Sequence, residues 1–518
     1  MDFWGLCYTM LLMPTSIMFY QGSGIYRIVS LVITALLSVQ GCAFLQLDRG
    51  ANEYQPLDDH TATVSSNSVL SSQKLEVEQQ IPFVRLAISG GGSRSANFAA
   101  AVMEELDRYG FLENVTAISA VSGGTLPAAY YALHKNDRDW NWRRLRELMR
   151  TNFYNEFLWK HFNPWGLLNY IFTEYNRSDM MADVFDDILF HRSTFGDLPA
   201  GPPQLIINAT AFPGGQPWRF TEQNLRSINS RFDTYPIARA IAASTSVPGI
   251  FNGIPLRNYQ TAGSYTYIHL LDGGIEENLG LQTLLDMYRQ SVQTPSMYWY
   301  DEKSTPIKAC FIFLVDSFPD MQKPYGHETA LHRRDLRSHS DFIIDRNLMS
   351  ALDIMSNNAH TRTLDALSPT RRYLEDPYFT ITYYFYNESY HCTVWRLHAA
   401  YLRSTNLIHS KDPKQNLVRW HLAAMLPTIE THWKLVAPNS CSSLTLQDAL
   451  YEGAKELVRK NRMALEGTKR WFKSQGIPLK QIDSEDSADD TSDFIEHVSP
   501  DAYKGMEEVK DFCASDSN

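Results

Sequence analysis

Residues 83 to 134 alternate between short apolar segments and segments with helical spacing, and a glycine-containing turn follows each apolar segment. The run 83–88 is rich in branched and aromatic side chains, which favours a buried strand. Helical spacing follows over 95–108, a second short strand is predicted over 115–119, and another helix runs to about His134. This repeated order of strand, turn and helix predicts an α/β domain with a parallel sheet.

Later elements follow from the same periodicities. Strands are expected at 204–211, 267–271, 308–316 and 378–386, and helices at 236–244, at 341–366 and, after residue 386, as far as about Asn461. Residues 136–200 interrupt the rhythm of strands and helices. We therefore place one α/β domain at 81–465, with 136–200 as a helical insertion.

The insertion 136–200 is unusually aromatic. Its aromatic side chains include Trp140, Trp142, Phe153, Phe157, Trp159, Phe162, Trp165, Tyr170 and Phe172. Such side chains can pack a helical insertion on a sheet. They also suit a lid or a membrane-binding surface, since Trp and Tyr favour a water–lipid boundary. The sequence leaves both interpretations open.

Most of the charge lies in the C-terminal tail. The chain of 518 residues has a formal net charge of −11, and residues 482–518 contain twelve acidic residues and two lysines. The rest of the chain has no basic surplus, which excludes the electrostatic footprint of a nucleic-acid-binding protein. Because the tail is also poor in apolar residues, we expect it to be disordered.

The six cysteines show no pair with the spacing of a zinc or redox site. Those outside the leader are too widely spaced to predict a disulfide framework, although disulfides form in exported proteins. No acidic ligand loop of the kind that binds calcium accompanies the motifs described below. We therefore predict neither a metal nor a cofactor.

Residues 1–42 contain the parts of an export signal. Arg27 precedes a mostly apolar run over 28–39, which is shorter than the roughly 20 apolar residues of a membrane-spanning helix. Residues 43–80 are polar, and we expect them to form a flexible tether between a membrane and the domain.

The leader ends in the sequence SVQGC, which resembles the lipobox of bacterial lipoproteins. This resemblance implies cleavage before Cys42 and lipidation of that cysteine. Because Ala43 follows, it also implies sorting to the outer membrane, with the protein facing the periplasm. An uncleaved N-terminal membrane anchor and plain secretion are the alternatives. The leader has an ordinary length if translation begins at Met18 rather than Met1.

Ser122 lies between the second predicted strand and a helix, in the sequence AVSGG. Such a serine can occupy a nucleophile elbow, a strained turn that lifts the hydroxyl out of the sheet beside the N-terminus of the next helix. Small neighbours are needed because the turn brings backbone segments close together. The usual G-x-S-x-G pattern is relaxed here by Ala120, and alone the motif fits a plain glycine-rich loop equally well.

Gly90, Gly91 and Gly92 lie between the first predicted strand and its helix. Three glycines let successive N–H groups converge on one point, which suits an oxyanion. The same arrangement could hold a phosphate. However, the Lys-Ser/Thr pair of a P-loop is missing, and Ser95 replaces the last glycine of G-x-G-x-x-G. The loop alone therefore does not decide between an oxyanion and a nucleotide.

Asp272 ends an apolar segment and is followed by Gly273 and Gly274. A carboxylate at the end of a strand lies at the edge where α/β sheets bind ligands. Asp-Gly is also a common turn pair, so this motif alone favours a turn.

Together, the order and separation of these three motifs resemble the patatin-like phospholipases. Further segments that match are ASTSVPGIF at 243–251, Asn208-Ala209-Thr210 and Leu426-Pro427-Thr428. The likeness covers 83–460 with gaps. It implies a three-layer α/β fold with a central, mostly parallel sheet, helical insertions and a helical C-terminal part, in a member of the bacterial lipoprotein type.

The resemblance also implies a serine acyl-hydrolase that cleaves ester bonds of phospholipids or other lipids at a membrane surface. Ser122 would be the nucleophile and Asp272 its base, with no catalytic histidine. An apolar pocket would raise the basicity of the carboxylate. The other implied site residues are the oxyanion glycines Gly90, Gly91, Gly92 and Gly123, the motif glycines Gly124, Gly273 and Gly274, and Arg94, with a structural role or a contact to the lipid phosphate.

Three alternatives stay open. A conventional triad could use one of the 15 histidines, such as His269, His360 or His398, although no spacing selects one. A non-catalytic, membrane-tethered lipid-binding protein could keep the same fold, an interpretation that rests on the departures at Ala120 and Ser95. A nucleotide-dependent enzyme is the third, but it lacks the partner residues of the glycine loop.

Overall fold

The computed structural model describes residues 83–162, 175–260, 267–293, 309–318, 355, 358–364, 378–385, 388–399 and 446–480. The predicted leader, tether and acidic tail, and most of the helix predicted over 341–366, lie outside the described residues. The chain divides into two compact units. All the elements below belong to the unit formed by 49–161 and 176–518, apart from the last residue of one helix.

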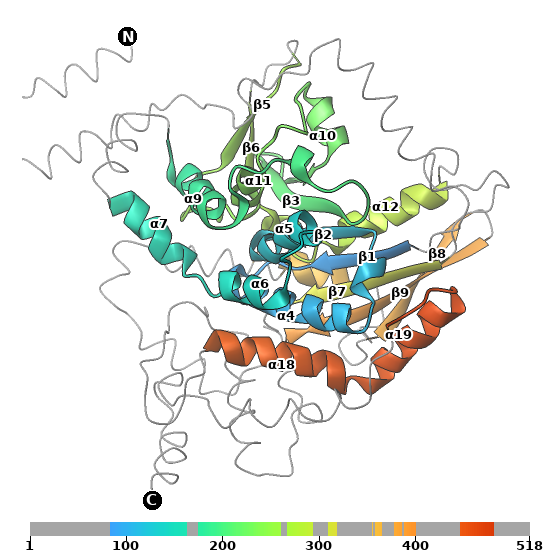
Figure 1. Cartoon of the computed structure of the whole chain (residues 1–518). Coiled ribbons are helices and arrows are strands. Elements are labelled where there is room, and N and C mark those ends of the chain that lie inside the picture. Colours follow the sequence, from blue (N-terminus) through green and yellow to red (C-terminus); the bar gives the residue numbers. More distant parts are fainter. Residues whose placement is uncertain are drawn as a thin grey trace, which may run out of the picture. The chain divides into compact units, whose positions relative to one another are not determined.

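A nine-stranded sheet forms the centre of the described region (Figure 1). Its strands are β1 (Phe83–Ile88), β2 (Ala117–Val121), β3 (Gln204–Phe212), β4 (Gln216–Phe220), β5 (Ile254–Arg257), β6 (Tyr267–Asp272), β7 (Ala309–Asp316), β8 (Tyr378–Phe385) and β9 (Glu388–His398). Their order is β5-β6-β3-β2-β1-β7-β9-β8, and β4 also pairs with β3. The central strands from β3 to β9 run parallel, and the flanking pairs are antiparallel.

Helices cover both faces of this sheet. They are α4 (Gly92–Arg108), α5 (Thr125–His134), α6 (Trp142–Met149), α7 (Phe153–Phe162), α9 (Arg177–Phe185), α10 (Glu222–Ser227), α11 (Ile237–Ser244), α12 (Leu281–Gln293), α18 (Leu446–Lys460) and α19 (Arg462–Ser474). Figure 1 shows α18 beside α4, on which it packs.

Strand β7 shows why the fold has three layers. Successive side chains of a strand point to opposite faces. Ile312 belongs to a buried apolar cluster with Leu284 of α12, whereas Phe311 and Phe313 contact Phe472 of α19, with ring centroids 5.8 and 6.2 Å apart. Both faces of β7 are therefore buried, which explains why its sequence is continuously apolar. The predicted α/β fold with a mostly parallel centre is confirmed.

The C-terminal part departs from the prediction. The pattern after residue 386 predicts helices, whereas the structure has β9 from Glu388 to His398, paired in parallel with β7. The predicted helical end near Asn461 matches the end of α18, but Asn461 then accepts a hydrogen bond from the N–H of Ala464 and caps a further helix, α19.

A buried disulfide joins Cys310 of β7 to Cys392 of β9. The two cysteines are register partners in the parallel pair. The sequence separation of 82 residues gave no spacing from which this pairing could be predicted.

The described part of the predicted insertion is largely helical, with some aromatic side chains packed in the core and others exposed. Phe157 of α7 is buried against Phe251, with ring centroids 5.4 Å apart. Trp159 on the same helix is 76% exposed. Within the described ranges, no helix combines the length and the apolar character needed to cross a membrane.

Candidate active site

Ser122 occupies a strained turn between β2 and α5. It has a positive φ of 49°, and it starts a single 3-10 turn that leads directly into α5. A non-glycine residue in this left-handed region costs conformational energy, so the surrounding structure must hold it. The backbone N–H of Ser122 donates to the hydroxyl of Ser244, 2.8 Å away, and that hydroxyl donates to the carbonyl of Asn208 at 2.5 Å. This is the geometry of a nucleophile elbow.

Glycine is required after Ser122 because two backbone segments meet there. A Cβ on Gly123 would collide with the carbonyl group of Gly92, and a Cβ on Gly124 would lie 2.6 Å from the carbonyl oxygen of Ser89. The turn at Ser122 therefore packs directly against the glycine loop. Ala120, where the usual motif has glycine, is fully buried in β2.

Asp272 lies at the end of β6, a strand that runs in the opposite direction to β2 and β3. Strand β6 runs antiparallel to β3 and ends at Asp272, which is opposite Ala209. Residues 121 and 208 are partners in the neighbouring β2–β3 pair. The end of β6 therefore lies beside the end of β2, and the Ser122 hydroxyl donates to Asp272 Oδ2 at 2.9 Å.

Burial controls the protonation of Asp272. Both Ser122 and Asp272 are only 7% exposed. Burial raises the pKa of Asp272 from 3.8 to about 6, although hydrogen bonds from the Gly274 N–H and the Ser122 hydroxyl favour the carboxylate. A carboxylate in such surroundings is a stronger base than one in water.

The glycine loop connects β1 to α4 and lies beside Ser122. A Cβ on Gly90 would be 3.2 Å from the Cβ of Ser122. Gly91 and Gly92 have positive φ values of 139° and 59°. Within the described part of the chain, their N–H groups carry no hydrogen bond, whereas the N–H of Gly90 donates to the carbonyl of Asn278 at 2.9 Å.

Arg94 and the glycines after Asp272 have definite contacts. Arg94 Nε donates to the carbonyl of Ser317 at 2.9 Å, and the side chain is partly exposed. A Cβ on Gly273 would lie 2.5 Å from the carbonyl oxygen of Asn208, so only glycine fits there. Gly274 supplies the N–H that binds Asp272 Oδ1 at 2.7 Å.

Two residues that support the elbow, Ser244 and Asn208, lie in segments that match the family, but neither was assigned a role in the site from the sequence. Asn208 in β3 donates to Ser119 Oγ and to the carbonyl of Ala120, both at 2.9 Å, and it accepts from Thr283 at 2.8 Å. A buried asparagine in an otherwise apolar strand must have partners. That rule is the signal that could have marked it.

The histidines that the sequence left as triad candidates lie elsewhere. His360 and His398 gather around Asp316. His269 lies on β6, opposite Phe212 and Pro255. In the described residues, the Ser122 side chain hydrogen-bonds to Asp272 and to no histidine.

Part of the chain matches the model of a known protein family. Residues 86–285 match the family model described as patatin-like phospholipase. No curated protein matches the chain.

The solved structures that resemble this chain have low sequence identity to it. Human GIVD cytosolic phospholipase A2 is 12% identical, with a TM-score of 0.42, over 80% of this chain and 63% of that one. The same human enzyme in complex with methyl gamma-linolenyl fluorophosphonate gives 12% identity and a TM-score of 0.41, over 79% of this chain and 64% of that one. VipD from Legionella pneumophila is 14% identical, with a TM-score of 0.24, over 49% of this chain and 52% of that one. The match thus spans less than two thirds of the human phospholipase.

Proposed function

We propose that this chain, whose residues 86–285 form a patatin-like phospholipase domain, is a serine acyl-hydrolase that cleaves ester bonds of phospholipids or other lipids. The family match supports lipid hydrolysis in general. The observation that carries the finer proposal is the 2.9 Å hydrogen bond from the Ser122 hydroxyl to Asp272, with Ser122 in a strained elbow.

In the proposed reaction, Ser122 Oγ attacks the ester carbonyl carbon while Asp272 Oδ2 takes the hydroxyl proton. The tetrahedral intermediate collapses, the protonated Asp272 gives its proton to the leaving alcohol oxygen, and an acyl-Ser122 ester is left. A water then attacks this ester, with Asp272 again as the base. The products are the alcohol or lysolipid, the free fatty acid and the regenerated serine.

The developing oxyanion would be held by the glycine loop and the elbow. The N–H groups of Gly91 and Gly92 are the loop donors that this proposal uses, since that of Gly90 is bonded to Asn278. The N–H of Gly123, directly after the nucleophile, is the third donor. Donors of this kind typically contribute about 10²- to 10³-fold each to the rate.

Hydrolysis of two substrate classes tests the proposal. We would measure release of fatty acid from phospholipid vesicles and from a neutral ester, using wild type, Ser122→Ala and Asp272→Asn. Both variants should lose activity by about 10³-fold or more. Ser227→Ala removes an exposed hydroxyl on α10 and is the matched control. Hydrolysis at the wild-type rate by either site variant would exclude the Ser122–Asp272 dyad.

The binding-protein alternative rests on Ala120 and Ser95, and both are accommodated in the fold. Ala120 fills a buried position in β2, and the Ser95 hydroxyl donates to the carbonyl of Ser89 at 2.5 Å. No contact of the described residues favours the alternative over hydrolysis. Lipid binding without fatty-acid release by the purified wild type would favour it.

We also propose export and attachment to the outer membrane through lipidated Cys42, with the domain facing the periplasm. The support is the lipobox-like sequence and the Cys310–Cys392 disulfide, because disulfides persist in oxidising compartments. Cys42→Ser should release the protein from membranes and abolish lipid labelling. Labelling retained in this variant excludes Cys42 as the modified residue, and membrane retention without labelling favours an uncleaved anchor.

A further inference from the structure

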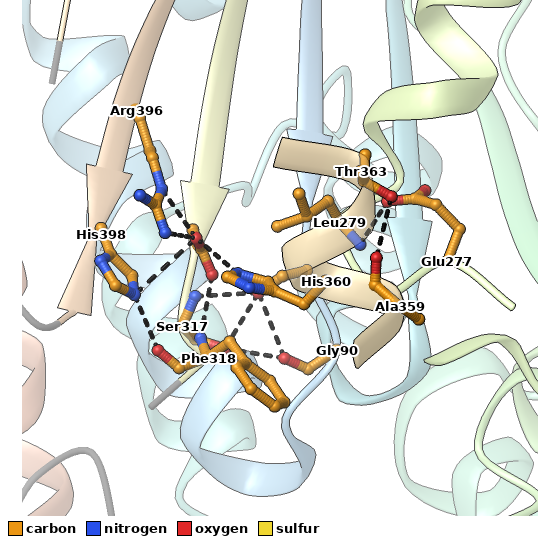
Figure 2. A network of polar contacts seen from close by, with 12 residues as sticks. Gly90, Glu277, Leu279, Ser317, Phe318, Ala359, His360, Thr363, Arg396 and His398 are labelled. Atoms are coloured by element: carbon orange, nitrogen blue, oxygen red, sulfur yellow. Dashed lines mark hydrogen bonds and ion pairs between the residues drawn. The ribbon is translucent and has the colours of Figure 1, made fainter. Parts of the chain in front are cut away.

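A second group of buried charged side chains lies at the ends of β7 and β9, next to the glycine loop (Figure 2). Asp316 is fully buried and accepts hydrogen bonds from Arg396 Nη2 at 2.6 Å and from Arg396 Nε at 2.9 Å. His360 Nε2 lies 3.0 Å from the same oxygen. His398 Nε2 contacts the carbonyl of Phe318 at 2.8 Å. The proposed reaction uses none of these side chains.

This cluster keeps Asp316 ionised. Burial acts to raise the pKa of Asp316, but the neighbouring His360 and Arg396 outweigh it and hold the pKa well below its ordinary value. Loss of Arg396 would leave this buried carboxylate without its guanidinium partner, which is strongly unfavourable, and loss of His360 would remove one of the three side-chain hydrogen bonds to Asp316 Oδ2. The cluster is therefore a rigid anchor at the end of β7.

The anchor continues into the turn formed by residues 316–318. Asp316 Oδ1 accepts a hydrogen bond from the N–H of Phe318 at 3.1 Å. The Phe318 ring stacks on His360, with centroids 4.7 Å apart. These contacts fix the position of Ser317, the residue between them, which is fully buried.

Ser317 in turn holds the glycine loop at three points. Its hydroxyl donates to the carbonyl of Gly90 at 2.9 Å, its N–H donates to Ser89 Oγ at 2.8 Å, and its carbonyl accepts from Arg94 Nε at 2.9 Å. Figure 2 shows Ser317 between the cluster and Gly90. A Cβ on Gly91 would lie 2.8 Å from Ser317 Oγ, so the loop fits closely around this hydroxyl.

The carbonyl of Gly90 and the N–H of Gly91 belong to the same peptide unit. A peptide unit is planar and trans, so its C=O and N–H point in opposite directions. A hydrogen bond that fixes the Gly90 carbonyl therefore also fixes the direction of the Gly91 N–H. Ser89 Oγ also donates to this carbonyl, at 3.2 Å, so Ser317 supplies the shorter of its two hydrogen bonds, in a loop whose glycines restrain rotation least.

We propose that Ser317 is a positioning residue for ester hydrolysis: held by Asp316, His360 and Arg396, it orients the Gly90–Gly91 peptide so that the Gly91 N–H can bind the oxyanion. The inference rests on the proposed function. It assigns a role to residues of β7, β9 and the helical segment 358–364, which contribute no reacting group.

Ser317→Ala is the variant that tests this role. Using a soluble p-nitrophenyl ester as the probe, we expect kcat to fall by about 10- to 100-fold, less than or equal to the loss of one oxyanion donor, with KM unchanged. Thr468→Val is the matched control, because it removes a buried hydroxyl that donates within α19, at 2.8 Å to the carbonyl of Ala464. It should lower the melting temperature and leave kcat unchanged.

A second pair of variants tests the anchor. His360→Gln retains a side-chain N–H that can reach Asp316, whereas His360→Leu does not. We expect kcat to be low in His360→Leu and largely restored in His360→Gln.

The outcomes separate this inference from the proposed function. A wild-type kcat in Ser317→Ala, or an equal loss of kcat in Thr468→Val, overturns the positioning role while the proposed function stands. Equal loss of kcat in the two His360 variants overturns the anchor. A wild type without hydrolysis overturns the proposed function and the inference together.

Discussion

The hydroxyl of Ser244 accepts a hydrogen bond from the backbone N–H of Ser122 at 2.8 Å. Ser244 is the last residue of α11 and is fully buried. Its own proton goes to the carbonyl of Asn208 in β3. One hydroxyl thus connects the strained elbow to a helix and a strand that are distant in the sequence, and it holds the elbow against relaxation.

Ser244→Ala should therefore weaken both the fold and the reaction. It leaves the buried N–H of Ser122 without an acceptor, which costs about 1–3 kcal/mol of unfolding free energy. A small displacement of the nucleophile should also lower kcat/KM by about ten- to a hundredfold. Denaturant unfolding and ester hydrolysis measure the two effects, with Ser227→Ala as the control. Unchanged values in both assays contradict the supporting role.

The rate of hydrolysis should follow the ionisation of Asp272. Burial raises the pKa of this carboxyl to about 6, and only the carboxylate can take the Ser122 proton. We expect kcat/KM to be constant above this pH and to fall tenfold per pH unit well below it. A profile measured between pH 4.5 and 8 checks this. Activity that stays level down to pH 4.5 argues against Asp272 as the base.

Stability should fall with rising pH because of Glu277. Burial raises the pKa of Glu277 from 4.5 to about 8, although the Leu279 N–H donates to it at 2.7 Å. The folded state therefore holds a proton that the unfolded chain has released, and this contribution is lost as the pH rises from about 4.5 to 8.

Glu277→Gln removes this titration but keeps an oxygen acceptor for the Leu279 N–H. Its free energy of unfolding should match that of the wild type near pH 4.5 and exceed it at pH 8.5. Urea unfolding at both values measures the difference. Parallel pH dependences of the two proteins would show that Glu277 releases its proton in the folded state as readily as in the unfolded chain.

The Cys310–Cys392 disulfide should contribute to stability. Its cysteines are separated by 82 residues, and a bridge that closes such a loop typically contributes about 2–4 kcal/mol. The double variant Cys310→Ala/Cys392→Ala should melt at a lower temperature than oxidised wild type. Reductant should lower the melting temperature of the wild type to a similar value and leave that of the variant unchanged. The prediction would be contradicted if the wild type, unfolded and refolded in reductant, kept the melting temperature of the oxidised protein.

Local pattern was sufficient for the first strands and helices of the domain, but it did not predict the short strands β4 and β5. Strand β1, helix α4 and helix α5 follow from apolar periodicity and from the glycine-containing turns, and β7 is apolar because both its faces are buried. Strand β9 was missed because it contains Arg396 and His398, which typically lie at the surface. Both are buried in β9, where Arg396 pairs with Asp316 of β7 and His398 contacts the carbonyl of Phe318.

The candidate site divides in the same way. Ser122, Asp272 and the glycine loop belong to short motifs that can be recognised in the sequence. The residues that support them cannot be recognised in this way. Ser244 contacts a residue that is 122 positions away in the sequence, and Ser317 contacts one that is more than 220 positions away. Only the pairing of strands brings those partners together.

Labelling with a fluorescent fluorophosphonate tests the central claim, that Ser122 is an activated nucleophile. We would treat wild type, Ser122→Ala and Ser227→Ala with and without detergent, and map the modified peptide by mass spectrometry. We predict labelling of wild type and Ser227→Ala at Ser122, and none of a folded Ser122→Ala. Labelling of Ser122→Ala at the wild-type rate, or an unlabelled wild type under both conditions, would contradict the claim.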